Sequence, residues 1–286
     1  MISIVICSRT TIIPNRLACN INDTIGVEHE IIVIDNSLNV FSIFEAYNSG
    51  LSRSRGELIC FLHDDIIIHS QDWGRILGEI FHSNPEAGLI GVAGSKMKTK
   101  MPSAWWDCPE DQKAINIIQH FEEPNREKEK WYKGFETGTE VEVAVIDGVF
   151  MALRRDQRIK FNTRMTGFHN YDLNLALECH RLALKVIVTN RILLEHYSIG
   201  NQDSKWYLST TELHKIYKSI LPLNPEKSWT DCQSLRKQEF LNGVAFVKGL
   251  LAQNYKKQAV YYWLRLLTLK PYSKFHFNFL RSLILK

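Results

Sequence analysis

The sequence lacks any uninterrupted apolar run of about 20 residues, the length that a membrane-spanning helix requires. The apolar stretch within MISIVICSRT covers only about six residues and follows no basic leader, so it is too short for a signal peptide. The six cysteines are scattered without paired metal spacing, which favours free thiols in a reducing compartment. These absences predict a cytoplasmic protein, which could still lie against the inner face of a membrane.

Two classes of function are disfavoured by what is missing. No G-x-G-x-x-G motif follows a strand-like segment, which argues against a dehydrogenase. The net charge of +4 is mild and no nucleic-acid-binding module accompanies it, so we expect no nucleic-acid partner. With 286 residues, 45% hydrophobic and 23% charged, the composition fits one large domain, alone or with an appendage.

Polar side chains follow three strand-like segments in the first quarter of the chain. These polar ends are Ser8 and Arg9 after residues 3–7, Asp35 to Ser37 after residues 30–34, and His63, Asp64 and Asp65 after residues 57–62. Helical segments expected near residues 16–22 and 40–54 separate the strands, which predicts an α/β fold with a mostly parallel sheet and helices on both faces. Ligands bind beyond the carboxyl ends of such strands, so we expect all three polar groups along one rim.

The sequence His63-Asp64-Asp65 places two adjacent carboxylates directly behind an apolar strand. Two neighbouring carboxylates repel each other unless a positive charge lies between them. One interpretation is a solvated turn, because aspartate is common in turns. The other interpretation is a site for a divalent cation such as Mg²⁺ or Mn²⁺, which prefers oxygen ligands.

The middle of the chain continues the alternation of strands and helices. We expect a helix over residues 73–83, strands within 87–95, 140–154 and 185–196, and an amphipathic helix over 171–185. The charged segment 121–134 is interpreted as a surface loop or as a lid over the substrate, with Trp131 and Tyr132 as sugar-stacking faces. Trp105, Trp106 and Asp107 are candidates for an acceptor wall.

The amino-acid composition changes after about residue 209, where segments expected to be helical are rich in tyrosine, tryptophan, lysine and leucine. Residues 240–286 contain eight basic residues and no acidic one. We therefore expect a first domain over residues 1–208 and a helical, basic and aromatic region over residues 209–286. This region is interpreted either as an appendage with a solvated basic face or as an attachment to an anionic membrane, to which each basic residue contributes roughly 1 kcal/mol.

Four motifs occur in the order found in family 2-like glycosyltransferases of the GT-A fold, a Rossmann-like fold. They are IVICSRT, EIIVIDNS, AYNSGLSRSRGELICFLHDDI and YDLNLALECHRLALKV. The sequence most resembles the streptomycin-biosynthesis-type glycosyltransferase-like domain, whose acidic motif also reads His-Asp-Asp. The resemblance covers roughly residues 1–200. It implies a role only for those residues of this sequence that match a position in one of the family motifs.

The resemblance implies a nucleotide site at the strand ends. By position, Ser8 and Arg9 would lie against the nucleotide, Asp35 would contact its base, and Asn48 and Arg53 would line its pocket. Alternatives remain open, because Asp35 could cap the next helix and Arg53 could be a surface residue. Asp147 matches a segment that faces the acceptor, although Asp147-Gly148 could equally be a simple turn.

The resemblance also implies a metal site and a catalytic base. His63-Asp64-Asp65 matches the Asp-x-Asp signature of the family, with Asp65 as the leading metal ligand, Asp64 as the second candidate, and His63 as a ligand or a ribose contact. His196 matches a histidine that some members use to contact metal or phosphate. Asp172 matches the aspartate that acts as general base in inverting members, or it caps the helix that begins there; His169 is the reserve base.

The resemblance thus implies a metal-dependent inverting glycosyltransferase. It would move a sugar from a nucleoside-diphosphate donor, most often a UDP-sugar, to a hydroxyl of a glycan or lipid-linked glycan in surface polysaccharide biosynthesis. His63, Tyr171 and Asn174 depart from the family pattern, which keeps a non-catalytic binding or scaffold protein open as an alternative. A sugar nucleotidyltransferase is a further alternative, although its glycine-rich loop with a following arginine is missing after the first strand.

Overall fold

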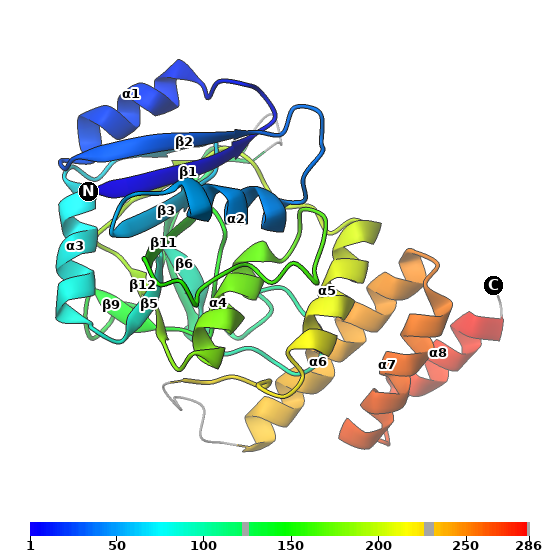
Figure 1. Ribbon diagram of the computed structural model, residues 1–286. Coiled ribbons are helices and arrows are strands. Elements are labelled where there is room, and N and C mark those ends of the chain that lie inside the picture. The colour runs from blue at the N-terminus through cyan, green and yellow to red at the C-terminus, as the bar shows by residue number, and fades with distance from the viewer. Residues whose placement is uncertain (122–125, 226–231, 285–286) are drawn as a thin grey trace.

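A computed structural model describes residues 1–121, 126–225 and 232–284 (Figure 1). Its larger sheet has seven strands in the order β2-β1-β3-β11-β5-β12-β9. The strands are β1 (Ile2–Ser8), β2 (His29–Asp35), β3 (Leu58–Leu62), β5 (Ala87–Gly91), β9 (Glu140–Glu142), β11 (Phe150–Arg154) and β12 (Lys185–Thr189). Five of the seven run in one direction, and β11 and β9 run against them. The mostly parallel α/β sheet expected from the sequence is thereby confirmed.

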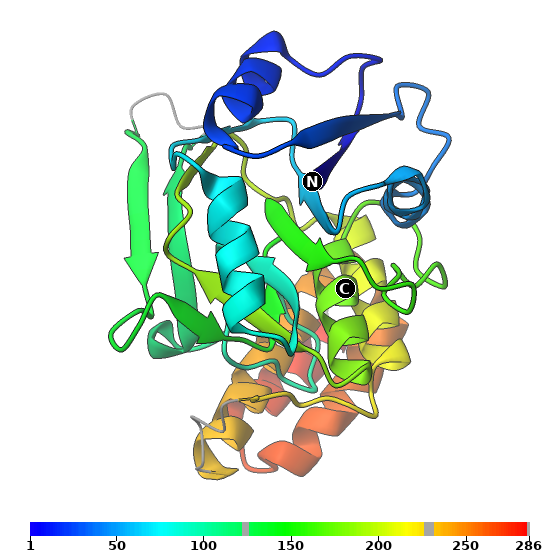
Figure 2. The same cartoon turned by 60° about the vertical axis from the view of Figure 1, so that its left-hand side comes forward.

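The helices that precede β12 cover both faces of this sheet, as the sequence predicts (Figures 1 and 2). They are α1 (Asn15–Thr24), α2 (Ile43–Arg53), α3 (Trp73–Ser83) and α4 (Tyr171–Arg181). On one face, the ring of Tyr47 in α2 lies 4.7 Å from that of Phe61 in β3. On the other, the ring of Trp73 in α3 lies 5.8 Å from that of Phe150 in β11. Burial of these apolar faces is the main force that fixes the layers.

A second sheet was not expected from the sequence. It contains β10-β6-β7-β13-β4, and β8 pairs with β7 outside this path. The strands are β4 (Ile66–Ile68), β6 (Ala93–Ser95), β7 (Lys113–Gln119), β8 (Glu129–Lys133), β10 (Val145–Ile146) and β13 (Leu194–His196), and a short 3₁₀ helix (Glu110–Gln112) precedes β7. The single strand expected over residues 185–196 is therefore wrong, because β12 and β13 belong to different sheets.

The interpretation of residues 121–134 as a loop or lid is also wrong where the segment is described. Residues 129–133 form β8, which pairs antiparallel with β7 along its whole length. Trp131 packs against the main core and Tyr132 is largely exposed. The density of charge along the segment reflects its place at the edge of a sheet, where charged side chains are common. Residues 122–125 lie outside the described chain.

Four helices follow the second sheet, as the sequence predicts: α5 (Ser204–Ile216), α6 (Cys232–Ala252), α7 (Lys256–Leu269) and α8 (Lys274–Ile284). A second apolar cluster includes Phe246, Leu250 and Leu266, and it reaches Met101 and Ala104 in the segment between β6 and β7. The expected boundary at residue 208 falls inside α5, which joins both clusters through Trp206 and Leu213. No helix in the described part of the chain is both long and apolar enough to cross a bilayer.

Candidate active site

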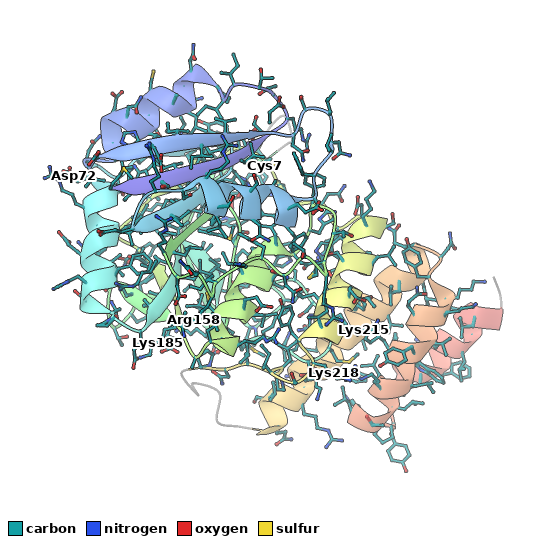
Figure 3. All side chains as sticks on the ribbon, viewed as in Figure 1. Cys7, Asp72, Arg158, Lys185, Lys215 and Lys218 are labelled. Atoms are coloured by element: carbon teal, nitrogen blue, oxygen red, sulfur yellow. The ribbon has the colours of Figure 1, made fainter. Side chains whose placement is uncertain are left out.

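A cavity of about 890 Å³ lies beyond the carboxyl ends of β1 and β3. Its walls also come from the start of α4 and from the segment that leads into α5. Figure 3 labels Cys7 near the end of β1, and this residue belongs to the wall. The lining includes nine of the site residues expected from the sequence: Ser8, Arg9, His63, Asp64, Asp65, Asp147, His169, Asp172 and His196.

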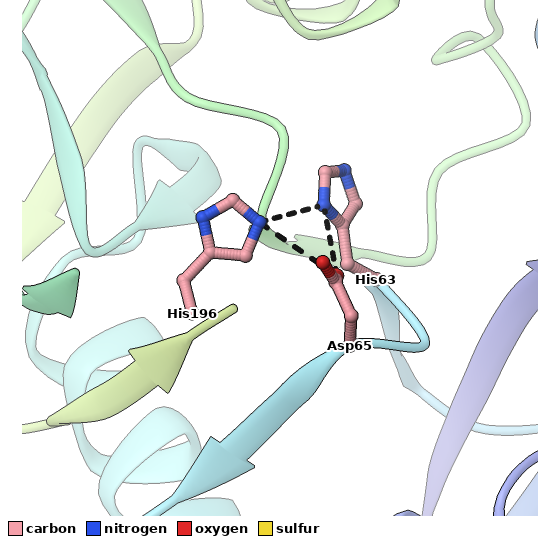
Figure 4. Close-up of side chains that lie close together, drawn as sticks. All are labelled: His63, Asp65 and His196. Atoms are coloured by element: carbon pink, nitrogen blue, oxygen red, sulfur yellow. Dashed lines mark hydrogen bonds and ion pairs between the residues drawn. The ribbon is translucent and has the colours of Figure 1, made fainter. Parts of the chain in front are cut away.

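Three of these residues converge on one point (Figure 4). The His63 Nδ1 atom lies 3.3 Å from His196 Nε2, and each of these nitrogens lies 3.7 Å from Asp65 Oδ1. His63 and Asp65 stand in the turn between β3 and β4. His196 ends β13, which pairs antiparallel with β4 and places His196 opposite Ile66. Strand pairing between segments that are far apart in the sequence therefore builds the cluster.

The donor set fits a divalent cation. A cation with metal–ligand bonds of about 2.1 Å holds neighbouring ligand atoms about 3 Å apart, close to the separations within this cluster. A histidine ligand must be neutral. Burial lowers the pKa of His196, and the neighbouring His63 lowers it further. The cluster thus offers two imidazole nitrogens and one carboxylate oxygen to a common point.

The outer nitrogens of both imidazoles also have partners. The His196 Nδ1–H group donates to Gln119 Oε1 over 3.1 Å, where Gln119 ends β7 directly beside His196 in the strand register. The His63 Nε2 atom lies 2.5 Å from the hydroxyl oxygen of Tyr171, at the start of α4. Each ring is therefore held from behind while its other nitrogen faces Asp65.

The remaining polar groups of the cavity include two cations and a second carboxylate close to β1. The Ser8 hydroxyl donates to Asp64 Oδ2 over 3.1 Å, which links the ends of β1 and β3. Arg9 and Lys205 are exposed residues that also belong to the lining. Lys205 was not predicted, because nothing in the sequence ties the first turn of α5 to the strand ends.

Asp172 lies at the start of α4, where its Oδ1 atom accepts the backbone N–H of Leu173 over 2.8 Å. Burial raises the pKa of this carboxyl group to about 7, and the nearby Asp147 raises it in the same direction. A carboxyl group with a pKa near the working pH can accept a proton and release it again, as a general base requires. His169, the reserve base, also lines the cavity and pairs with Asp203, Nε2 to Oδ1, at 3.2 Å.

Two neighbouring tryptophans form an aromatic wall of the cavity. The Trp105 Nε1–H group donates to Asp147 Oδ2 over 2.7 Å, and the ring of Trp106 lies 5.6 Å from that of Trp105. Both tryptophans line the cavity, whereas Asp107 turns back to accept the backbone N–H of Ala104. Asp107 therefore shapes the loop instead of contributing to the wall.

The loop that carries this wall is fixed by α6 and by a buried lysine. Glu239 in α6 accepts the backbone N–H groups of Lys100 and Met101 at 2.5 and 2.7 Å. The buried Lys98 ammonium donates to the carbonyl and hydroxyl oxygens of Ser103 at 2.5 and 2.6 Å. Desolvation lowers the pKa of Lys98 to about 8. The C-terminal helices thus support one side of the cavity.

Three predicted site residues do not reach the cavity. Asn48 forms two hydrogen bonds with the backbone of Phe161, at 2.8 and 3.0 Å, which hold that segment against α2. Arg53 is exposed in the last turn of α2. Asp35 is exposed, and its Oδ1 accepts the backbone N–H of Ser37; the alternative role as a cap is not observed, because Ser42 caps α2. The adjacent Asn36 and Ser37 belong to the lining instead.

One departure from the family pattern has a structural explanation. Asn174 is fully buried, where its Oδ1 accepts the backbone N–H of Asn162 at 2.9 Å. Its Nδ2 lies 3.1 Å from the hydroxyl of Tyr217, which follows α5. An acid here would be buried against these groups, so the amide serves to join α4 to α5.

The comparisons with known proteins agree with this architecture. A family model described as "Glycosyltransferase like family" matches residues 8–220. The structure of GalNAc-T7 with UDP, GalNAc and Mn²⁺ is similar at a TM-score of 0.51 and 9% identity, over 76% of this chain and 48% of that one. The chain thus spans about half of GalNAc-T7. S. aureus TarS 1-349 with UDP-GlcNAc is similar at a TM-score of 0.51 and 10% identity, over 86% and 80%. No curated protein sequence matches the chain.

We predict that Asp172→Asn stabilises the protein at high pH and not at low pH. The raised pKa means that wild-type stability falls as the pH rises from about 4 to 7 and stays low above 7, whereas the amide has no charge to bury. The expected gain in the free energy of unfolding at pH 8 is about 2 to 4 kcal/mol, measured by urea titration.

Asp156→Asn is the matched control for this prediction. Hydrogen bonds from Arg158 lower the pKa of the Asp156 carboxyl group, so its replacement should give no gain at pH 8. A gain for Asp172→Asn that is equal at pH 4.5 and pH 8 would contradict the burial of a charged carboxylate at this position.

Proposed function

The chain belongs to the glycosyltransferase-like family whose model covers residues 8–220, and we propose from this premise that it transfers a sugar from a nucleoside-diphosphate donor to a hydroxyl acceptor. The observation that carries the proposal is the juxtaposition, in one cavity, of the His63–Asp65–His196 cluster and the carboxyl group of Asp172. The closer relationship to the streptomycin type stays a prediction.

The charge balance of the cavity supports a donor that arrives with a cation. Four carboxylates line it: Asp64, Asp65, Asp147 and Asp172. The permanently cationic side chains in the same described lining are Arg9 and Lys205. A diphosphate brings further negative charge and would be repelled without a counter-ion. The structures of GalNAc-T7 with UDP, GalNAc and Mn²⁺ and of TarS with UDP-GlcNAc suggest a uridine nucleotide donor and a divalent cation.

His63, Asp65 and His196 would hold the Mn²⁺ or Mg²⁺ ion. When bound, the ion would supply positive charge that offsets the charge developing on the leaving diphosphate. Asp64, which accepts a hydrogen bond from Ser8, would contact the nucleotide, and Arg9 and Lys205, which line the same cavity, would contact phosphate oxygens. A UDP-sugar is the donor that we favour.

Asp172 is the base in this proposal. An acceptor hydroxyl has a pKa far above neutrality, so a carboxylate must take its proton as the hydroxyl oxygen bonds to the anomeric carbon. The hydroxyl oxygen attacks the anomeric carbon on the side opposite the diphosphate. The bond to the diphosphate breaks in the same step, and the configuration at the anomeric carbon is inverted. Burial raises the pKa of Asp172 toward neutrality, and Asp147, which accepts a hydrogen bond from Trp105, raises it further.

The aromatic wall supports a carbohydrate acceptor. Trp105 and Trp106 offer flat apolar faces at the cavity, and sugar rings have apolar faces of similar size. A glycan or lipid-linked glycan in surface polysaccharide assembly is the acceptor class that we propose. The hydrogen-bonded replacements at His63, Tyr171 and Asn174 weigh against the alternative of a decayed scaffold protein.

We also propose that the C-terminal helices contact an anionic membrane. Tyr272 is 97% exposed and Phe277 is 72% exposed, with Lys274 and Arg281 exposed nearby on α8. An apolar groove of about 450 Å³ lies between α6 and α8, with Lys248 among its lining residues. Two copies meeting through this surface would bring like charges together, because residues 240–286 include no acid. Aromatic side chains with surrounding cations suit an anionic lipid surface instead. Cytoplasmic localisation stays a prediction.

The metal role predicts cation-dependent nucleotide binding. In a thermal-shift assay with Mn²⁺, UDP at about 100 times its dissociation constant should raise the melting temperature by roughly 3 to 6 °C. Asp65→Ala removes a ligand and should abolish the rise, whereas Asp156→Ala, remote from the cavity, should retain it. If UDP, GDP and dTDP all leave wild type unchanged with Mn²⁺ present, the proposed donor site is wrong.

The base assignment predicts a separation of binding from chemistry. Asp172→Asn should bind the donor with Mn²⁺ as wild type does, while kcat for transfer falls roughly 10²- to 10⁴-fold. Because the base must be deprotonated, kcat/KM of wild type should rise with pH and level off above an apparent pKa near 7. His169→Gln is the parallel variant; loss of transfer there, with retention in Asp172→Asn, would reassign the base to His169.

The membrane surface predicts a selective loss of vesicle binding. Each basic residue near an anionic surface contributes about 1 kcal/mol, so Lys274→Gln with Arg281→Gln should weaken binding to phosphatidylglycerol vesicles about 30-fold. Lys160→Gln with Arg164→Gln removes two exposed charges elsewhere and is the control. Flotation that is equal for both double variants, or equal on neutral phosphatidylcholine, would contradict the surface.

A further inference from the structure

The orientation of the His196 ring is fixed by the amide of Gln119. The Gln119 Nε2 group donates to the carbonyl oxygens of His120 and Ser198, both over 2.8 Å. These bonds require the amide nitrogen on that side, which leaves Oε1 facing the His196 ring. A carbonyl oxygen can only accept, so the proton of His196 resides on Nδ1 and the lone pair of Nε2 points toward Asp65.

The ring of His63 is held in a corresponding way by Tyr171. The Tyr171 hydroxyl oxygen lies 2.5 Å from His63 Nε2, and the partly buried tyrosine ring packs at 5.5 Å against that of Tyr47. A hydroxyl can accept a hydrogen bond as well as donate one. The Tyr171 hydroxyl can therefore accept a hydrogen bond from His63 Nε2–H, which leaves the lone pair on Nδ1 free to bind a metal ion. In both imidazoles, therefore, one ring nitrogen contacts an oxygen atom and the other ring nitrogen faces Asp65.

Glycine at position 148 permits this contact. A Cβ atom at Gly148 would lie 2.4 Å from the Tyr171 hydroxyl oxygen and 2.6 Å from two ring carbons. No side chain other than hydrogen leaves room for the tyrosine ring in its present place. The Asp147-Gly148 pair is thus more than a turn, because the glycine admits the residue that contacts His63.

We propose that Gln119 and Tyr171 are positioning residues that present two imidazole nitrogens to the cation site, and that they make the site select Mn²⁺ over Mg²⁺. The inference rests on the metal role in the proposed function and specifies its ligand field. Imidazole nitrogen binds first-row transition cations better than it binds Mg²⁺, which prefers oxygen and retains its water. Partners behind metal-binding histidines typically change metal affinity 10- to 100-fold.

This proposal explains why two departures from the family pattern occur together. His63 stands at the first position of the Asp-x-Asp signature, and Tyr171, which also departs from the family pattern, stands directly before Asp172. The two replacements contact each other across the cavity. A histidine ligand needs an oxygen behind it, whereas an aspartate ligand at the same position would have no ring to orient.

The test measures Mn²⁺ and Mg²⁺ affinity of the full chain by calorimetry, without donor or acceptor. Tyr171→Phe should weaken Mn²⁺ binding about 10- to 100-fold and Mg²⁺ binding much less, so that the preference for Mn²⁺ falls. Electron spin-echo spectra of bound Mn²⁺ should contain nitrogen couplings from two histidines in wild type and from fewer in the variant. Tyr47→Phe, which removes a neighbouring hydroxyl without touching His63, should leave Mn²⁺ affinity unchanged.

A second variant keeps the test decisive if Tyr171→Phe does not fold. Gly148→Ala should reproduce its effect by displacing the ring, whereas Gly78→Ala, where a Cβ meets no atom within 4 Å, is the matched control. The double variant should lose no more than either single variant, because both act through one contact. Wild type without Mn²⁺ binding would overturn the metal site and this inference together. Wild-type affinity, selectivity and spectra in both variants would overturn this inference alone.

Discussion

Electrostatic repulsion among carboxylates at one rim of the sheet is the constraint on which the arrangement of the cavity depends. Asp64, Asp65, Asp147 and Asp172 all line the same space. Hydrogen bonds compensate two of them, since Ser8 donates to Asp64 and Trp105 donates to Asp147. Asp65 instead faces one nitrogen of each of two imidazoles. Burial, with a further contribution from the nearby Asp147, raises the pKa of the Asp172 carboxyl group to about 7. The cavity thus contains a carboxylate suited to accept a proton near neutrality, and a divalent cation would offset the charge of the others.

The C-terminal helices take part in the cavity, although they follow the strands that carry most polar groups. Glu239 in α6 accepts two backbone N–H groups of the loop that leads to Trp105. Asn242, one turn further, donates to Thr99 and to the carbonyl oxygen of Asp107, both over 2.9 Å. A surface that contacts a membrane through α8 would therefore belong to the same helical unit that supports the acceptor wall. Such a connection would keep the cavity at a fixed height above that membrane.

Local sequence sufficed for the features that depend on neighbours in the chain. The apolar runs before Ser8 and His63 predicted strands, and the polar groups behind them predicted the rim that β1 and β3 form. The second sheet was not predicted because β4 and β13 have only three residues each and because its strands pair over long separations in the sequence. Gln119 and Lys205 were not predicted for the same reason, because their positions depend on strand register and on the docking of α5. Asn48 was expected in the nucleotide pocket, but it binds the backbone of Phe161, a contact that no local pattern encodes.

Departures from a family pattern can indicate that a site has lost its function or that other residues now perform it. The contacts of the substituted residues distinguish these two cases. A decaying site leaves polar groups without partners, because no selection maintains their geometry. Here His63 and Tyr171 contact each other, Gly148 leaves room for the contact, and Asn174 forms hydrogen bonds in the fully buried interior. Any residue other than glycine at position 148 would place its Cβ atom against the ring of Tyr171. The coincidence of histidine, tyrosine and glycine at three distant positions therefore argues for replacement and against decay.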